Sequence, residues 1–366
     1  MQEKKGMEVT IWSRFRKNKP ALSGLFIILL CLMVSFFGYW LAPDNTPDAD
    51  LQVLEVQSQP PGFEKLFLTV PKSQIQETGI FSTLLYGSPS RFDYIPVNSY
   101  VVSGDSISVE KYVDEDTSVW IHYSISNIIG NNTKKIESCI VRKTFLLGTD
   151  VFGRDILSRL IIGTRVSMAV GFIAVLVALF VGIILGAMAG YYRGRTDDII
   201  MWLINVVWSI PTLLLVFAFT IAFGKGFWQI FIAVGLTMWI GVARLVRGQV
   251  MAIRELEYVQ AAKVMGFSDL RIIVRHILPN MTGPLLVVAS GIFASAIIIE
   301  AGLSFLGIGI QPPQPSWGLM IRENYTYLIT DKPMMALIPG LAIMLLVLAF
   351  NFLGSGLRDA FDVKSE

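Results

Sequence analysis

Few residues of this chain have the types and spacing that chemistry needs. Asp150 and Asp155 flank Arg154 in a short polar stretch, and a close pair of carboxylates can act as general acid and base. Aspartates in such stretches more often hold a surface turn and cap a helix, and we expect those roles here. His122 and His276 stand far apart, so they form no cluster with metal-ligand spacing. The sequence therefore disfavours a metal enzyme.

Glu300 is a further chemical candidate, because it lies at the outer end of an apolar stretch. An ionisable residue at bilayer depth is a functional hypothesis by default, so we take it as a candidate contact of a transport pathway. The alternative is that it lies at headgroup depth or pairs with an arginine. No segment has the form G-x-x-x-x-G-K-[ST] of the phosphate loop. We therefore expect no ATP hydrolysis of that kind by this chain.

The elements that carry these residues are mostly apolar. Hydrophobic residues make up 53% of the chain and charged residues 16%, far from a globular average, so most of the chain is expected in the lipid bilayer. The net charge of +2 gives no reason to expect nucleic acid as a partner. A membrane-spanning helix needs about 20 apolar residues, and six such windows occur: 21–41, 166–192, 199–224, 226–243, 281–299 and 334–357.

Basic residues at the ends of these windows predict their orientation, because short cytoplasmic loops are rich in Lys and Arg. The first window is too long for a signal peptide and lacks a cleavage site before Pro43, so we interpret it as a retained anchor. Both termini are then predicted to be cytoplasmic, together with three basic groups: Lys4, Lys5, Arg14, Arg16, Lys17 and Lys19; Arg193 and Arg195; Arg244, Arg247, Arg254, Lys263, Arg271 and Arg275. The opposite side has Lys225, Arg322 and Lys332 in its short loops.

Between the first two windows lies a long polar segment, residues 43–145. Runs rich in Val, Ile and Tyr and punctuated by Pro and Gly predict short strands, at 66–70, 94–102, 107–113 and 119–125. We expect a small β-rich extracytoplasmic domain. It is either a solvated insertion without activity or a contact for a substrate-delivering protein, since loops often carry binding roles.

Within the windows, glycine and proline predict helix packing and bending. Gly182, Gly186 and Gly190 recur at every fourth residue, which places them on one helix face and permits close contact with another helix. Pro211 is predicted to kink the third span.

The pattern of residues 257–280 predicts two short helices that are separated by a glycine. Gly266 can adopt the left-handed conformation that ends the first helix, with Lys263 at the negative end of its dipole. Ser268 is a candidate N-cap of the second helix, Asp269 suits its positive end, and Pro279 is expected to close it. The small side chains that would let another surface approach closely are Ala261 and Ala262.

This segment resembles the EAA motif, the cytoplasmic coupling loop of ABC-importer permeases, whose pattern is Glu-Ala-Ala, three residues, then Gly. Gln260 stands at the acid position, which keeps hydrogen bonding and loses charge. The alternative is an ordinary amphipathic hairpin between spans. The resemblance implies that an ATPase docks on the following residues: Tyr258, Gln260, Ala261, Ala262, Lys263, Gly266, Ser268 and Asp269.

Two other segments resemble the peptide and nickel permease group of that family. The first, G-T-D-x-x-G-R-D, consists of Gly148, Thr149, Asp150, Gly153, Arg154 and Asp155. The second contains Gln311, Pro312, Trp317 and Gly318. Its prolines and tryptophan alone indicate a rigid turn with an aromatic ring at the membrane interface. Within the group, the long loop and the Gln-Pro-Pro segment indicate the C-type partner of a heterodimer.

The predicted fold is an all-α polytopic membrane protein, with six transmembrane helices of the type I ABC importer permease fold and a β-rich extracytoplasmic insertion between helices 1 and 2. The expected parts are a cytoplasmic tail (1–20), helix 1 (21–42), the insertion (43–145), a permease core (146–357) with its coupling loop (247–280), and a second tail (358–366).

The resemblance implies a permease subunit in a bacterial inner membrane, not an enzyme. Its implied partners are a sister permease, two ATPases that hold the ATP and magnesium, and an extracytoplasmic solute-binding protein. Two other classes are less consistent with the sequence: an intramembrane enzyme would show paired acids or a His cluster, and an ion-coupled secondary transporter would show inverted repeats. Peptides are favoured over nickel complexes as substrate, although the sequence does not decide between them.

Overall fold

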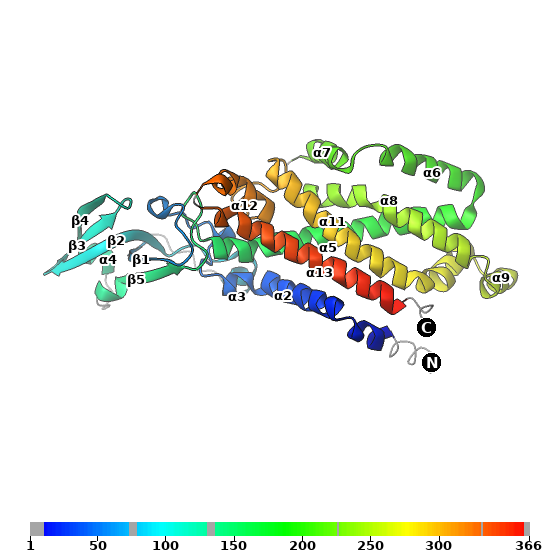
Figure 1. The fold of residues 1–366 in the computed structure, drawn as a ribbon, viewed down its shortest axis with the longest axis horizontal. Coiled ribbons are helices and arrows are strands. Elements are labelled where there is room, and N and C mark those ends of the chain that lie inside the picture. Colours follow the sequence, from blue (N-terminus) through cyan, green and yellow to red (C-terminus); the bar gives the residue numbers. More distant parts are fainter. Residues whose placement is uncertain (1–10, 73–78, 130–135, 225–226, 331, 362–366) are drawn as a thin grey trace. The chain divides into compact units, whose positions relative to one another are not determined.

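The protein is described here by a computed structural model, which covers residues 11–72, 79–129, 136–224, 227–330 and 332–361. The chain forms two compact units (Figure 1). The helical unit comprises Met1–Leu32, Ser167–Gln311 and Leu341–Glu366, and the sheet unit comprises Met33–Val166 and Pro312–Gly340. Of the residues discussed above, those outside the described part of the chain are Lys4, Lys5, Lys225 and 362–366.

Long apolar helices make up most of the chain. Within the described residues, five are long and apolar enough to cross a membrane: α2 (Lys19–Leu41), α5 (Ile156–Tyr192), α8 (Phe227–Ile253), α11 (Thr282–Phe305) with the turns before it, and α13 (Met334–Phe361). A sixth span exists if α6 (Gly194–Trp208) and α7 (Thr212–Phe223) together count as one. These helices correspond to the six predicted windows.

The third window is the main correction to the predicted spans. Instead of one kinked helix, α6 and α7 are separate helices whose axes differ by 92°. Pro211 cannot donate a backbone hydrogen bond, and its ring excludes the residue before it from helical geometry. The expected kink is therefore a full break at residues 209–211. Other helices are longer than predicted: α5 begins at Ile156, α8 continues to Ile253, α11 to Phe305 and α13 to Phe361.

The predicted glycine contacts are present between α5 and α8, which run side by side (Figure 1). A Cβ atom added to Gly182 or Gly186 would lie 2.5 Å from the nearest atom of α8, and one added to Gly190 would lie 2.7 Å away. The nearest atom to Gly186 is the backbone carbonyl oxygen of Ala243, which cannot move without shifting the helix. The glycine stripe therefore sets the distance between these two helices.

Gly186→Leu is expected to destabilise the helical unit, because the larger side chain would force α5 and α8 apart. Overpacking of this kind costs about 1–3 kcal/mol, which predicts a clear fall in the melting temperature of the purified protein in detergent. Gly248→Leu is the matched control, since a Cβ atom at Gly248 in α8 meets nothing within 4 Å. Equal melting temperatures for the two variants would contradict this packing role.

The sheet unit contains a five-stranded antiparallel sheet with the order β4-β3-β2-β1-β5 (Figure 1). The strands are β1 (Phe63–Pro71), β2 (Phe92–Ser103), β3 (Ser106–Tyr112), β4 (Ser118–Ser124) and β5 (Ile140–Phe145). Four of them match predicted strands. β5 was not predicted, because Arg142 and Lys143 interrupt its apolar alternation.

Both faces of the sheet bury apolar side chains. One cluster is formed by Val53, Val56, Phe67, Tyr112 and Phe145. The other is formed by Leu68, Val97, Ile107, Val109 and Ile128, the last from the short helix α4 (Ile125–Ile129). The unit also contains α3 (Ile80–Tyr86) and α12 (Trp317–Asn324). The insertion therefore has a hydrophobic core of its own.

Candidate functional site

The helical hairpin predicted after the fourth window consists of α9 (Glu257–Val264) and α10 (Asp269–Ile272). Gly266 has φ +78°, the left-handed conformation that ends α9. Ser268 has extended N-cap geometry, but its side chain makes no capping hydrogen bond. The hairpin is labelled at α9 in Figure 1.

The second arm of the hairpin does not end at Pro279 as predicted. After α10 the chain forms a π-helical turn, Ile273–Ile277, and a 3-10 turn, Leu278–Met281, which lead into α11. Pro279 lies in the first residues of the 3-10 turn, where a missing backbone N–H is tolerated. The hairpin is therefore joined to a membrane helix by a continuous series of helical turns.

The inner face of the hairpin packs against the helical unit. Val259, Ile272 and Ile277 are buried in one cluster with Val246 and Val250 of α8. This packing also corrects a prediction, because Ala262 is 1% exposed and belongs to the same cluster, whereas Ala261 is exposed. Only one of the two small residues is therefore available for an approaching surface.

Polar contacts attach the hairpin to the end of α5. The Tyr191 hydroxyl donates to Asp269 Oδ1 at 2.7 Å. The Arg254 guanidinium donates to the Tyr191 carbonyl at 2.6 Å and stacks over the Tyr191 ring at 5.4 Å. Gln260, at the family's acid position, donates its amide to the Arg254 carbonyl at 2.9 Å. A glutamate cannot donate this bond, which gives the substitution a structural reason.

Tyr191→Phe is expected to loosen the hairpin without unfolding the protein. The substitution removes the hydroxyl bond to Asp269, and one such bond contributes about 0.5–1.5 kcal/mol. Backbone amides of 266–272 should therefore exchange with deuterium several times faster in native-state hydrogen exchange. Tyr192→Phe is the control, because that neighbouring ring is 50% exposed. Unchanged exchange at 266–272 in Tyr191→Phe would show that the hydroxyl does not hold the hairpin.

The outer face of the hairpin exposes apolar side chains. Val264 is 90% exposed, Leu270 72%, Met265 65% and Val274 54%. We call these four residues the hairpin patch. Large apolar side chains exposed within one short segment are typical of an interaction site. Tyr258 and Lys263 are also exposed beside it.

A cavity of about 570 Å³ lies within the helical unit, between α6, α7, α8, α11 and α13. Its walls are mostly apolar but include Arg244, Ser295, Asn351 and Arg358. The Arg244 guanidinium lies 3.7 Å over the Trp208 ring and donates to Asn205 Oδ1 at 2.9 Å. The cavity thus combines a large apolar wall with cationic groups, an arrangement suited to a solute that carries negative charge or carbonyl oxygens.

Glu300 lies in α11 and is 0% exposed. Its Oε1 accepts a hydrogen bond from the Ser304 hydroxyl at 2.7 Å, and the Ser304 hydroxyl oxygen accepts from the Ile310 amide at 3.0 Å. These contacts support the chain after α11, and Glu300 does not line the cavity described above. Its contact with a transport pathway stays a prediction.

The first signature segment forms a buried charged cluster in the sheet unit, not the expected surface turn. Arg154 is 2% exposed and donates to Asp150 at 2.7 Å, to Asp50 at 3.2 Å and to Glu323 at 2.7 Å. Arg159, also buried, reaches the same Glu323 at 3.2 Å. We call these five residues the arginine cluster. Buried charges of this kind persist only when they are paired, so the cluster joins three distant parts of the chain.

The predicted turn and cap roles of the aspartates do hold within this buried setting. Asp150 Oδ1 accepts from the Phe152 amide at 2.9 Å and the Arg154 amide at 3.0 Å. Asp155 Oδ2 accepts from the Ser158 amide at 3.0 Å at the start of α5. The rest of the signature is also structural: Thr149 is buried and donates to Val56, and the two glycines have positive φ, at Gly148 (+80°) and Gly153 (+72°).

The second signature segment is architectural. Trp317 is 3% exposed, packs against Gly163, and donates its indole N–H to the Leu160 carbonyl at 3.0 Å. The ring therefore anchors the start of α12 within the sheet unit, and its place at the membrane interface stays a prediction. Gly318 beside it is buried and Pro312 is exposed. Gln311, in the helical unit, donates to the Gly307 and Gly309 carbonyls.

Sequence reasoning missed several residues that the structure brings to these sites. Tyr191 and Asp269 are separated by 78 positions, and Arg154 and Glu323 by 169. No periodic pattern links such pairs. A signal did exist for Arg244, because it directly follows the predicted apolar window 226–243, but this arginine was interpreted only as a marker of orientation.

Comparison with known proteins places these features in a family. The family described as "Binding-protein-dependent transport system inner membrane component" matches residues 182–365. A second family, "N-terminal TM domain of oligopeptide transport permease C", matches residues 9–61.

The chain is also similar to curated permease proteins. The chain is 44% identical over 218 residues to a glutathione transport system permease protein of Pectobacterium atrosepticum, covering 60% of this chain and 72% of the relative. It is 42% identical to a dipeptide permease of Bacillus subtilis (59% and 68% covered) and 38% identical to an oligopeptide permease of the same species (66% and 77%). A solved MetNI methionine ABC transporter has a TM-score of 0.42 at 16% identity, covering 54% of this chain and 94% of the other.

Proposed function

This chain belongs to the family of binding-protein-dependent transport system inner membrane components, and from that premise we propose that it is the C-type permease subunit of an ATP-driven peptide importer. It would form half of a translocation pathway beside a sister permease. Two ATPase subunits would supply the energy, and an external solute-binding protein would deliver the substrate. The chain itself belongs to a family of transport subunits, not of enzymes.

The observation that carries this proposal is the two-sided hairpin. Its inner face is buried against α8, and Asp269 ties it to the end of α5. Its outer face presents the hairpin patch. An ATPase that binds this patch can move the hairpin as a lever, because the hairpin is continuous with α11. Closure of the ATPase dimer would then bias the pathway between outward-facing and inward-facing states.

The cavity between α6, α7, α8, α11 and α13 is the proposed half-pathway. Peptides carry a terminal carboxylate and backbone carbonyls. These groups can accept hydrogen bonds from Arg244 and Arg358. The apolar walls suit side chains of varied shape, because apolar contacts do not depend on direction as hydrogen bonds do. This composition favours peptides over a metal complex, whose recognition would need ligand groups that match its charge and geometry.

In this proposal the chain crosses the membrane six times, with α6 and α7 together forming the third span. Both termini and the hairpin lie in the cytoplasm, because Lys and Arg concentrate at those ends of the helices. The five-stranded sheet then lies outside the cytoplasm in a bacterial inner membrane. These assignments rest on charge and family membership.

Uptake in proteoliposomes tests the proposed function. Vesicles would contain this chain, its sister permease and the ATPases, with the binding protein outside, and would be offered a labelled dipeptide or a labelled nickel complex. The proposal predicts ATP-dependent accumulation of the dipeptide, and none in vesicles that lack this chain. Accumulation of the nickel complex alone would replace the substrate assignment. Uptake driven by an ion gradient without ATP would contradict the proposal.

A further inference from the structure

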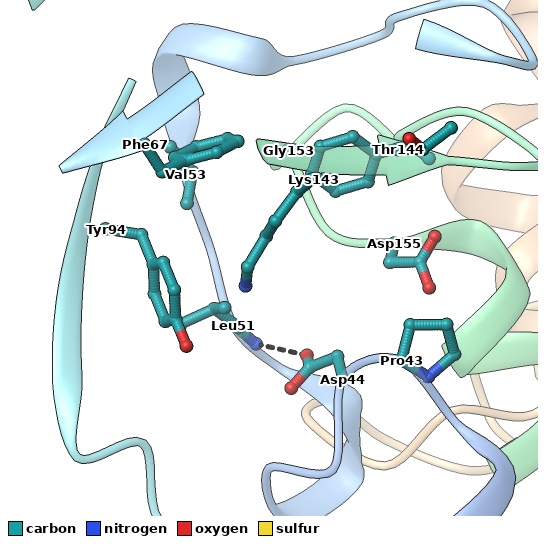
Figure 2. Close-up of a pocket in the computed structure, with 11 residues that line it drawn as sticks. Pro43, Asp44, Leu51, Val53, Phe67, Tyr94, Lys143, Thr144, Gly153 and Asp155 are labelled. Carbon is teal, nitrogen blue, oxygen red and sulfur yellow. Dashed lines mark hydrogen bonds between the residues drawn. The ribbon is translucent and has the colours of Figure 1, made fainter. Parts of the chain in front are cut away.

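The sheet unit encloses a cavity of about 220 Å³ that no function described above uses (Figure 2). Its floor and apolar walls are provided by Leu51, Val53, Phe67 and Phe145. Because one water occupies about 30 Å³ of liquid, this space accommodates several waters or one small molecule. It is smaller than the pockets of about 300–1,000 Å³ that hold drug-sized ligands.

One wall of the cavity presents a cation. Figure 2 shows the Lys143 side chain extending from β5 into the drawn space, with its amine directed away from the strand. The amine lies 3.4 Å over the Tyr94 ring. Within the described part of the chain, no hydrogen-bond acceptor or ion pair is found for it. Burial lowers the pKa of Lys143, and the nearby carboxylates of Asp44 and Asp155 act in the opposite direction.

A different element presents an unsatisfied acceptor to the same cavity. Asp155 is 7% exposed, and its Oδ2 is used by the Ser158 amide. Its Oδ1 is buried and has no hydrogen-bond partner among the described residues. Burial raises the pKa of this carboxyl. An orphaned carboxylate oxygen is costly, and a donor placed in the cavity would satisfy it.

The other acidic group at the cavity is already satisfied. Asp44 accepts from the Thr46 amide at 3.0 Å and from the Leu51 amide at 3.1 Å, the dashed contact in Figure 2. Two backbone donors fix this carboxylate in place. The groups left without direct partners are therefore one donor, at Lys143, and one acceptor, at Asp155.

A second cavity of about 390 Å³ shares five wall residues with the first: Pro43, Asp44, Leu51, Tyr94 and Lys143. It adds Arg91 to its wall and has mostly polar surroundings. Lys143 therefore lines both cavities, the more polar second one and the more apolar first one.

We propose that the inner cavity binds one small zwitterion of the α-amino-acid type with an apolar side chain. Its carboxylate would accept from Lys143, its ammonium would donate to Asp155 Oδ1, and its side chain would pack on Phe67 and Val53. A zwitterion matches the charges of both groups and adds no net charge to the cavity. A ligand with only one of the two charges would leave the other wall unpaired. The site is independent of the proposed transport function.

Binding of leucine to the full-length purified protein in detergent tests this inference by calorimetry and by the ligand-induced rise in melting temperature. Leucine should bind. Isocaproate, which lacks the amino group, and isoamylamine, which lacks the carboxylate, should each bind at least about tenfold more weakly, because each loses one charge-assisted hydrogen bond.

Lys143→Met and Asp155→Asn should each weaken leucine binding by about tenfold or more while keeping the shape of the wall. Lys72→Met is the matched control, since Lys72 pairs with Asp93 at 3.2 Å and does not line the cavity. Lys143→Met has the milder structural effect and keeps the test valid if Asp155→Asn does not fold.

Three results would overturn the inference: no leucine binding to the wild-type protein, which would leave the cavity to water; equal binding of leucine and isocaproate; or unchanged leucine binding in Lys143→Met. No transport is measured in this experiment. Its failure would therefore leave the proposed permease function untouched.

Discussion

Arg154→Met should lower the stability of the sheet unit by about 3–5 kcal/mol, the usual consequence of removing one partner from a buried ion pair. Methionine keeps an unbranched apolar stem but removes the guanidinium that contacts Asp150, Asp50 and Glu323. Three carboxylates would then share only Arg159. Thermal unfolding of the purified protein in detergent, followed by intrinsic fluorescence, measures the effect.

Arg142→Met is the matched control for this prediction. Arg142 lies on β5 of the same unit and pairs with Glu64 at 3.7 Å, but both side chains are more than half exposed. Exposed pairs of this kind contribute less than about 1 kcal/mol, so this variant should melt close to the wild type. If Arg154→Met melted together with Arg142→Met, the arginine cluster would not hold the signature segment in place.

Gly266→Val should abolish substrate uptake and the stimulation of ATPase activity, while leaving the protein inserted in the membrane. The left-handed conformation at Gly266 costs a residue with a Cβ atom about 1–2 kcal/mol, and a β-branched residue more. A free-energy difference of that size lowers the equilibrium constant for the native turn of the hairpin by about tenfold or more. The hairpin patch would then no longer face the ATPase in its native arrangement.

Gly266→Asn separates this conformational effect from a steric one. Nothing lies within 4 Å of a Cβ atom added at Gly266, so any larger side chain has space and only the backbone conformation matters. Asparagine tolerates the left-handed region better than other residues that carry a Cβ atom, and this variant should retain most of its uptake. Normal uptake by Gly266→Val in the same vesicles would contradict the lever role of the hairpin.

The apolar windows made much of the helical unit predictable, because burial in lipid imposes a length and composition that are visible in the sequence. The glycines of α5 were also informative, because their regular spacing places them on one face of the helix. The hairpin was predictable because Gly266 and Lys263 act locally, within one or two turns of chain. Features that depend on neighbouring residues or on long periodic segments can therefore be predicted from a single sequence.

The features that escaped prediction depend on distant partners or on backbone direction. The local sequence around Asp150 and Arg154 is typical of a surface turn. Only the fold brings Asp50 and Glu323 into contact with Arg154. The 92° break beside Pro211 was visible only as a kink, because residue types indicate that a helix stops but not the direction in which the next begins. The buried hydrogen bond of Trp317 could not be predicted either, because its acceptor, the Leu160 carbonyl, lies far away in the chain.

The measurement that tests the central claim most directly is affinity purification of this chain from its native membrane, followed by mass spectrometry of the proteins that co-purify. An untagged preparation serves as the control. The proposed function predicts recovery of a second multispanning permease together with one or two ATPases that contain the phosphate loop. Recovery of a stable chain without any ATPase would contradict it and would make the hairpin an ordinary loop between two helices.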